Sequence, residues 1–515
     1  MKYPIGIQSF EKIRTDGYVY VDKTALIYKL ADEGSYYFLC RPRRFGKSLL
    51  ISTIDAYFSG RRDLFKGLAI ETLEKDWAQY PVLHLDLNTQ KYDTESDLNQ
   101  VLDYNLRQWE EVYGKGSESY SLSLRFMSVV RNAYLKTGKR VVILVDEYDK
   151  PMLQAINNEK LQDEYRATLK AFYSVLKTQD RYIKFAFLTG VTKFGKVSVF
   201  SDLNNLVDIS MDARYQTICG ITKEEMVGNF DEGIRYVAST NDLGYEETCE
   251  MLRKRYDGYH FRQNGTAIYN PFSLLNTFST GEFGSYWFET GTPTFLVKLL
   301  HRDDYYLPNL TEEQVTADIL NSIDSMSMNP VPIIYQSGYL TIKGYDPEFK
   351  IYSLGFPNEE VSEGFLSYLL PYYTHVGQTE GPLYIRNFVH DLNRGKVDDF
   401  MKRMEVMFAD TDYKIVGDSE KYFQNAFYVV TKLLGFFVEV ERTISDGRID
   451  MLVKTKDYIY IFEFKYDQSA DVALKQIDDK GYAKPFAIDK RKLFKVGVDF
   501  NCKKRCIDDW KVVCE

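Results

Sequence analysis

The sequence predicts an α/β protein built from several domains, and three observations support this fold class. The chain has 515 residues, and at roughly 150 residues per domain this length favours about three domains. Apolar residues make up 44% of the chain, which is enough to build large cores. Over the first 220 residues, short apolar runs alternate with helical patterns, as in a parallel sheet covered by helices.

The first region, residues 1–220, is expected to contain that parallel sheet. The run at 141–145 reads VVILV, and a β-branched run without alternation indicates a strand that is buried on both faces. Further strands are predicted at 35–40, 81–87 and 183–188, with helices at 46–58, 96–113, 122–137 and 159–177.

The rest of the chain changes in character twice. Residues 221–345 are predicted to form a mainly helical domain, and residues 346–400 a helical connector. Residues 401–515 read as a separate α/β domain, in which a helix is followed by a strand series, a helix and a strand. We therefore expect four segments, with boundaries near residues 220, 345 and 400.

Charge and composition exclude some classes of protein. The net charge is 65 − 74 = −9, which argues against a surface coated in basic residues, although a local basic groove remains compatible with it. Because no apolar run reaches about 18 residues, no membrane-spanning helix is expected. The start of the chain lacks the apolar core of a signal peptide, so the expected location is the cytoplasm.

A phosphate-binding loop is predicted where the first strand meets its helix. The segment reads RPRRFGKS, and Gly46, Lys47 and Ser48 match the pattern G-x-x-x-x-G-K-[ST], whereas Arg41 replaces the first glycine. Backbone N–H groups and the helix end would hold the phosphates, Lys47 would reach the β- and γ-phosphates, and Ser48 would bind Mg²⁺. If the loop needs a positive φ at position 41, arginine adopts it at a cost. The predicted loop comprises Arg41, Pro42, Arg43, Arg44, Phe45, Gly46, Lys47 and Ser48.

Two carboxylates follow the buried strand at 141–145. Asp146 would hold Mg²⁺ through water, and Glu147 would orient and polarise the attacking water. Thr189, at the end of the next core strand, is a candidate polar sensor, and the alternative is a simple strand-to-loop cap. Arg43 and Arg44 either contact phosphate or a neighbouring subunit, or only make the loop basic.

These motifs resemble the bacterial AAA-ATPase-like family. The resemblance rests on PIGIQ at 4–8, YVDKT at 20–24, RPRRFGKS at 41–48 and LTGVTKF at 188–194. In that family the first loop glycine is usually arginine too. The resemblance covers most of the first 220 residues and implies that a P-loop NTPase domain binds ATP.

A second set of charged residues lies in the last 110 residues. Asp450 and Glu463 are expected on adjacent antiparallel strands, with Glu463 and Lys465 on one face. Carboxylates are the ligands that Mg²⁺ prefers, and a lysine near the attacking water would assist phosphodiester cleavage. This arrangement resembles the PD-(D/E)xK nuclease superfamily and implies a restriction-endonuclease-like fold. The resemblance also implies supporting roles for Glu420, Gln476 and Tyr482.

The sequence thus predicts binding and hydrolysis of ATP, coupled to a Mg²⁺-dependent nuclease acting on nucleic acid, with DNA favoured over RNA. The alternative is a nucleotide-dependent switch whose nuclease-like domain binds nucleic acid or a partner without cutting. A homo-oligomer or a partner protein is left open. The basic stretch Lys480, Lys484, Lys490, Arg491, Lys492 and Lys495 could meet a phosphate backbone or be an ordinary solvated face.

Overall fold

The computed structural model describes residues 1–515 except 117–119, 157, 194–198, 201–202, 292–295, 298, 301–304, 312, 322–328, 375, 378, 410–418, 436–438, 443–448 and 505. Contacts divide the chain into two compact units. Unit 1 comprises Met1–Gly291 and Thr311–Val361, and unit 2 comprises Thr292–Leu310 and Ser362–Glu515. The predicted boundaries near residues 220, 345 and 400 concern independent folding and stay predictions. Within the described ranges, no helix has both the length and the apolarity needed to cross a bilayer.

A five-stranded parallel sheet forms the centre of unit 1, in the order β2-β3-β4-β1-β5. The strands are β1 (Tyr36–Cys40), β2 (Val82–Asp86), β3 (Val141–Asp146), β4 (Ile183–Gly190) and β5 (Val207–Asp208). Every residue of β1 and β3 is buried, as expected for parallel strands covered on both faces. The four longer strands lie where the sequence predicts them, whereas the short edge strand β5 was not predicted.

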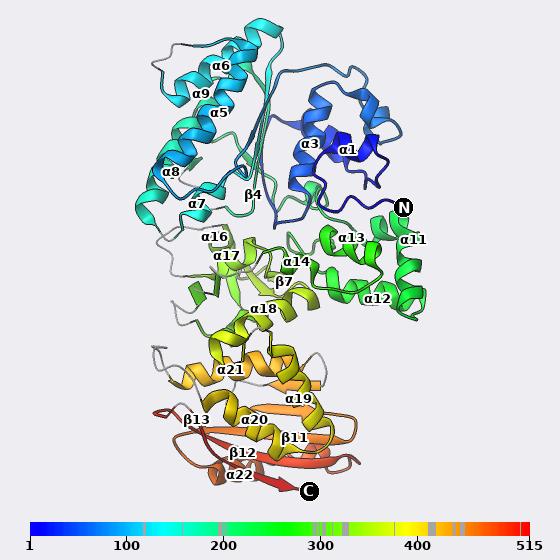
Figure 1. Ribbon diagram of the computed structural model, residues 1–515, viewed down its shortest axis with the longest axis vertical. Helices are drawn as coiled ribbons and strands as arrows, with labels where there is room; N and C mark the ends of the chain where they lie inside the picture. The colour runs from blue at the N-terminus through cyan, green and yellow to red at the C-terminus, as the bar shows by residue number, and fades with distance from the viewer. Residues whose placement is uncertain are drawn as a thin grey trace. The chain divides into compact units, whose positions relative to one another are not determined.

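Helices cover both faces of this sheet. In Figure 1, α5, α6, α8 and α9 lie on one side of the sheet, and α1 and α3 lie on the other. Thr94 and Asp97 form a capping box that fixes the start of α5. The helices are α1 (Phe10–Thr15), α2 (Thr24–Glu33), α3 (Lys47–Phe58), α4 (Ile70–Leu73), α5 (Glu95–Tyr113), α6 (Leu122–Thr137), α7 (Lys150–Gln154), α8 (Glu159–Tyr173) and α9 (Val175–Thr178).

The middle of the chain is mainly helical, but it also contains a small antiparallel sheet in the order β6-β8-β7. Its strands are β6 (Gln314–Thr316), β7 (Thr341–Asp346) and β8 (Ile351–Gly355). β8 lies in the segment that was expected to be a helical connector, so that expectation is wrong there: β7 and β8 pair across the turn that contains Lys350, whose φ is +56°. The helices are α11 (Lys223–Thr240), α12 (Tyr245–Tyr256), α13 (Pro271–Thr280), α14 (Tyr286–Glu289), α16 (Ala317–Asn321) and α17 (Val331–Gln336).

Unit 2 is built around a mixed sheet in the order β13-β12-β11-β10-β9. β11 and β12 run parallel, and the other neighbouring pairs are antiparallel. In Figure 1, α19, α20 and α21 lie on one face of this sheet and α22 lies on the other. The strands are β9 (Glu439–Arg442), β10 (Met451–Lys454), β11 (Tyr458–Tyr466), β12 (Lys492–Asn501) and β13 (Cys506–Cys514). The helices are α18 (Glu359–Tyr373), whose first turn belongs to unit 1, α19 (Gly381–Asn393), α20 (Val397–Ala409), α21 (Ser419–Leu434) and α22 (Ala470–Asp479).

Candidate functional sites

The phosphate loop joins β1 to α3 at the edge where parallel strands present their carboxyl ends. Gly46, with φ of +91°, is the N-cap of α3, and no side chain caps the helix there. The first N–H groups of a helix have no partner within the helix, so this end suits an anion. Ser48 is half-buried in the first turn of α3. The loop does not need a positive φ at Arg41, so the conditional cost of arginine there does not arise; the non-glycine residue with positive φ in the loop is Arg44, at +64°.

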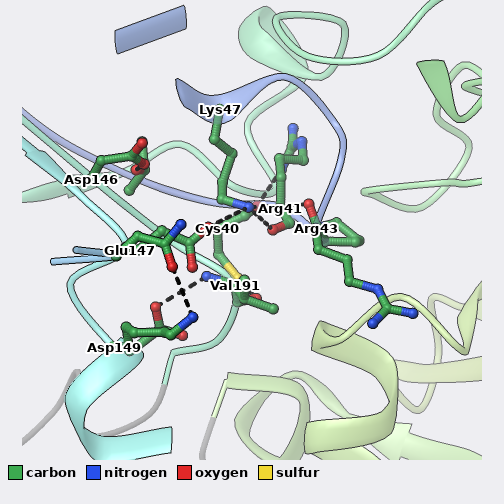
Figure 2. A network of polar contacts seen from close by, with 12 residues as sticks. Cys40, Arg41, Arg43, Lys47, Asp146, Glu147, Asp149 and Val191 are labelled. Atoms are coloured by element: carbon green, nitrogen blue, oxygen red, sulfur yellow. Dashed lines mark hydrogen bonds and ion pairs between the residues drawn. The ribbon is translucent and has the colours of Figure 1, made fainter. Parts of the chain in front are cut away.

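Lys47 is buried beneath the loop. Its Nζ donates to the carbonyl oxygens of Arg41 and Pro42 at 3.1 and 3.2 Å, and it lies 3.4 Å from Oε1 of Glu147 (Figure 2). Burial alone would lower the pKa of Lys47, but the carboxylates of Glu147 and Asp146 outweigh burial and raise it. Lys47 therefore stays charged at the place where a phosphate would lie.

The predicted carboxylates and the candidate sensor meet at the ends of β3 and β4. Oγ1 of Thr189 donates to Oδ1 of Asp146 at 2.5 Å, and Asp146 is buried. Glu147 follows with φ of +56°, and its side chain is about one-fifth exposed. The hydroxyl of Thr189 thus holds the Asp146 carboxylate in place, and a role of Thr189 as a sensor stays a prediction.

Sequence reasoning missed Asp149, which lies beside these residues (Figure 2). Its buried carboxylate accepts hydrogen bonds from the N–H of Val191 at 3.2 Å and from the N–H and Oγ1 of Thr192 at 2.6 and 2.7 Å. Burial, together with the charge of Glu147, raises the pKa of Asp149 to about 6. Asp149 therefore ties the loop after β3 to the loop after β4. The only sequence signal was a third acid three positions after Asp146.

The loop arginines Arg41 and Arg43 turn away from Lys47, toward the middle of the chain. The buried guanidinium of Arg41 donates to the carbonyls of Cys40 and Ser210 at 2.9 and 2.8 Å and lies 3.9 Å from the ring of Phe261. Arg41 thus holds the loop from behind instead of lining it.

Arg43 and Arg44 also have aromatic partners. The guanidinium of Arg43 lies 4.6 Å from the ring of Trp287 and donates to the hydroxyl of Tyr339 at 3.2 Å, while Nε1 of Trp287 donates to the carbonyl of Arg43 at 3.0 Å. In Figure 2 the Arg43 side chain extends away from Lys47, so a phosphate contact by Arg43 is not what this structure presents. Arg44 is exposed and lies 5.0 Å from the ring of Phe272.

The second candidate site lies on β10 and β11 of unit 2. Met451 is paired with Phe462 in antiparallel register, which places the preceding Asp450 opposite Glu463, as predicted. The N–H of Phe464 donates to Oδ2 of Asp450 at 2.8 Å. Lys465 donates from Nζ to Oε1 of Glu463 at 3.0 Å and to the carbonyl of Phe464 at 3.3 Å. Asp450, Glu463 and Lys465 are therefore neighbours.

The charges of this site are only partly compensated. Glu463 is 1% exposed, and its Oε2 has no hydrogen-bond partner among the described residues. Burial and the nearby Asp450 raise the pKa of Glu463 to about 7. Two carboxylates, one with a free buried oxygen, and the carbonyl of Phe464 are hard oxygen donors, which fit a divalent cation such as Mg²⁺. The described residues hold no cluster of three or more His, Cys, Asp or Glu side chains that could form a metal site.

The three supporting residues implied by the nuclease resemblance differ in their outcome: one contacts the carboxylate pair, one is buried, and the side chain of the third is not described. Gln476, on α22, donates from Nε2 to Oε1 of Glu463. Tyr482 is buried just after that helix, and burial raises the pKa of its hydroxyl. Glu420 belongs to α21, but its side chain lies outside the described residues, as do Gly447 and Arg448 before Asp450 and Phe194 in the ATPase region.

The basic stretch is less basic than its composition suggests. Lys495 pairs with Asp478, at 2.8 Å from Nζ to Oδ1, and with Glu515. Arg491 pairs with Asp489 at 2.7 Å. The remaining lysines of the stretch, Lys480, Lys484, Lys490 and Lys492, are exposed.

Comparisons with known proteins agree with the position of both sites. The model of a family described as "Predicted AAA-ATPase" matches residues 4–200, and that of the "PD-(D/E)XK nuclease superfamily" matches residues 418–510. A protein of Azotobacter chroococcum mcd 1, described as an uncharacterized protein in the vnfD 5′ region, is 37% identical over 528 residues, with 98% of this chain and 98% of its own length covered. The two matched regions contain the phosphate loop and the carboxylate pair.

Proposed function

Because the chain belongs to the AAA-ATPase-like family and carries a C-terminal domain of the PD-(D/E)XK nuclease superfamily, we propose that it is an ATPase coupled to a nuclease. Unit 1 binds and hydrolyses ATP at the phosphate loop. Unit 2 cleaves nucleic acid, DNA rather than RNA, with Mg²⁺ at the carboxylate pair. The observation that carries the proposal is the convergence of Asp450, Glu463 and Lys465, because opposed acids and a lysine at hydrogen-bond distance suit phosphodiester cleavage.

In unit 1 the residues have separate tasks. Lys47 and the uncapped end of α3 attract the phosphates. Ser48 and Asp146 would hold Mg²⁺, and Thr189 keeps the Asp146 carboxylate in place. Glu147 accepts a proton from the attacking water, which is the task of a general base. Mg²⁺, when bound, neutralises charge on the phosphate oxygens.

In unit 2 the tasks divide in a similar way. Asp450, Glu463 and the carbonyl of Phe464 would hold Mg²⁺, which when bound supplies Lewis-acid stabilisation of the phosphate. Lys465 orients the attacking water and offsets the negative charge that grows on the phosphate. Gln476 holds the Glu463 carboxylate in its orientation.

The ATPase half is tested by calorimetry with ATP and Mg²⁺. Lys47→Ala is expected to lose binding, because the buried cation at the loop is removed. A folded Lys47→Ala variant that binds ATP as well as the wild type would overturn the assignment.

The nuclease half is tested by cleavage of single- and double-stranded DNA and RNA, with Mg²⁺ or Mn²⁺, with and without ATP. Asp450→Ala and Lys465→Ala are each expected to abolish cleavage and leave ATP turnover largely intact. Asp457→Ala is the matched control, because Asp457 is an exposed acid in the turn between the same two strands. Equal residual nicking by wild type and Asp450→Ala would point to a contaminant and favour a module that binds without cutting.

A further inference from the structure

Glu147, the general base proposed above, has a backbone conformation that is uncommon for its residue type. Its φ is +56°, in the left-handed region. A residue with a Cβ adopts this region at a cost in free energy, and it stays there only where the surrounding structure holds it. The carboxylate of Glu147 lies 3.4 Å from Nζ of Lys47. Whatever holds the backbone of Glu147 therefore also decides where its carboxylate lies.

Both chain neighbours of Glu147 are held by the segment at the end of β4. On one side, Oγ1 of Thr189 donates to the carboxylate of Asp146. On the other side, the N–H of Tyr148 donates to the carbonyl of Thr189 at 2.9 Å. The hydroxyl of Tyr148 also donates to the carbonyl of Thr192 at 3.2 Å. Glu147 thus lies between two residues that are each attached to the same neighbouring segment.

A third attachment comes from Asp149, two residues after Glu147 (Figure 2). The buried carboxylate of Asp149 accepts one hydrogen bond from Val191 and two from Thr192. Its Oδ1 accepts from the first residue and its Oδ2 from the second, so both oxygens are engaged. Because a buried acceptor without a donor costs free energy, the loop after β3 is held tightly to the loop after β4.

Gly190 allows the two loops to approach this closely. A Cβ at position 190 would lie 2.6 Å from Cε1 of Tyr148 and 2.7 Å from Oδ1 of Asp149. Both of these side chains are buried, so neither can move aside freely. Even a methyl group at position 190 would therefore displace the residues that follow Glu147.

We propose that Asp149 is a positioning residue of the ATPase reaction. By binding the loop after β4, it holds Glu147 in the left-handed conformation that places the Glu147 carboxylate beside Lys47. The inference rests on the general-base role of Glu147 proposed above. Asp149 is assigned no contact with the nucleotide, so its loss should lower the rate of hydrolysis and not the affinity for ATP.

The test measures ATP hydrolysis by Asp149→Asn in two backgrounds, wild type and Glu147→Gln. Asparagine has one acceptor oxygen, so its amide N–H₂ would face an N–H donor of Val191 or Thr192. In the wild-type background, Asp149→Asn should lower the single-turnover rate about tenfold or more. The affinity for ATP with Mg²⁺, measured by calorimetry, should stay within about threefold.

The Glu147→Gln background separates positioning from a purely structural role. Because the base is already absent there, Asp149→Asn should change the remaining rate by less than about twofold. Single-turnover assays with excess protein are used because they resolve slow hydrolysis. A role of Asp149 in fold stability alone would lower the rate by the same factor in both backgrounds.

Asp97→Asn is the matched control, because Asp97 also accepts from the N–H groups of two successive residues, Asp93 and Thr94. It lies in the first turn of α5, and its substitution should leave the rate of hydrolysis within about twofold. Gly190→Ala displaces the Asp149 side chain without changing its charge, and it replaces Asp149→Asn if that variant does not fold.

The outcomes separate the positioning role from the proposed ATPase activity. Equal fold losses in the two backgrounds, a loss confined to the affinity for ATP, or a folded Asp149→Asn variant with the wild-type rate would each overturn the positioning role and leave ATP hydrolysis in place. If wild type hydrolyses no ATP, the proposed ATPase activity is overturned, and the positioning role with it.

Discussion

Lys47, in the phosphate-loop site, faces carbonyl oxygens and a carboxylate, whereas Glu463, in the carboxylate site, faces a second acid. Nζ of Lys47 contacts two carbonyl oxygens of its own loop and lies 3.4 Å from Glu147. Glu463 lies opposite Asp450, and one of its oxygens has no partner in the described part of the chain. The first site is compensated by the protein itself, and the second is only partly compensated, by Lys465 and Gln476.

This difference indicates what a ligand must do at each site. At the loop, a phosphate must replace the carbonyl contacts of Lys47, so binding exchanges one set of interactions for another. At the carboxylate pair, a cation would remove a repulsion that the fold otherwise tolerates. Removing a charge should therefore have opposite effects on stability at the two sites.

The largest expected effect sharpens the account of the loop site. Glu147→Gln should reduce ATP hydrolysis by at least about 100-fold, because the general base is lost, and leave the affinity for ATP within a few fold. Phosphate release and calorimetry measure the two quantities. Unaffected turnover would remove Glu147 from the role of base.

The second prediction concerns a buried acid of unit 1 that lies outside both sites. It tests whether burial of an acid also affects stability there. Glu360 accepts hydrogen bonds from Ser273 and from the N–H of Trp287, and burial raises its pKa to about 7. The folded protein thus keeps a proton that the unfolded chain releases between about pH 4.5 and 7, so stability should fall as pH rises through this window.

Glu360→Gln should weaken this dependence. Between pH 5 and 8 the unfolding free energy of wild type should fall by roughly 2 kcal/mol more than that of the variant. Denaturant titrations at both pH values measure it. Equal pH dependence in the two proteins would show that Glu360 keeps an ordinary pKa.

The third prediction tests whether removing a charge changes the stability of the protein in opposite directions at the two sites. In EDTA, Asp450→Asn should stabilise the protein by about 1 kcal/mol, because it relieves the repulsion of Glu463 while the asparagine oxygen can still accept from Phe464. Lys47→Ala should destabilise it, because Glu147 loses its partner. Denaturant titrations compare the variants. An Asp450→Asn variant that is less stable than wild type would contradict the predicted difference between the two sites.

The smallest effect concerns the basic stretch. Lys484→Ala should weaken nucleic-acid binding by a few fold and reduce the salt slope by about 1, because an exposed charge is lost. Lys495 pairs with Asp478 and Glu515, so Lys495→Ala should leave the salt slope nearly unchanged. Fluorescence anisotropy at several salt concentrations tests both. Equal salt slopes for the two variants would show that Lys495 does not keep its ion pairs with Asp478 and Glu515 when the protein is in solution.

Much of the fold could be predicted because its signals are local. The buried run at 141–145 and the helix that follows the G-K-S motif are visible within about ten residues, and the structure has β3 and α3 there. The sheet of β6, β7 and β8 was missed, because short strands gain their stability from partners rather than from their own sequence.

The sites divide along the same line. Asp146 ends β3, Lys47 begins the helix after β1, Asp450 directly precedes β10 and Glu463 lies within β11, and periodicity locates these elements. The contacts of Asp149 with Thr192, and of Arg43 with Trp287, join residues 43 and 244 positions apart. One sequence contains no local signal for such distant partners.

Gly338 leaves space for the phosphate loop, so a residue with a side chain at position 338 would collide with the loop. A Cβ at this position, where φ is +90°, would lie 2.6 Å from Cβ of Pro42. At Gly291, a Cβ would lie 1.9 Å from Nη1 of Arg43. The loop has an arginine where its pattern has a glycine, and it needs room at Gly338, about 300 residues further along the chain, whereas the atom close to Gly291 is the end of the flexible Arg43 side chain. Grafting RPRRFGKS into another P-loop protein would therefore transfer the sequence of this loop without the space beside Gly338 that Pro42 occupies.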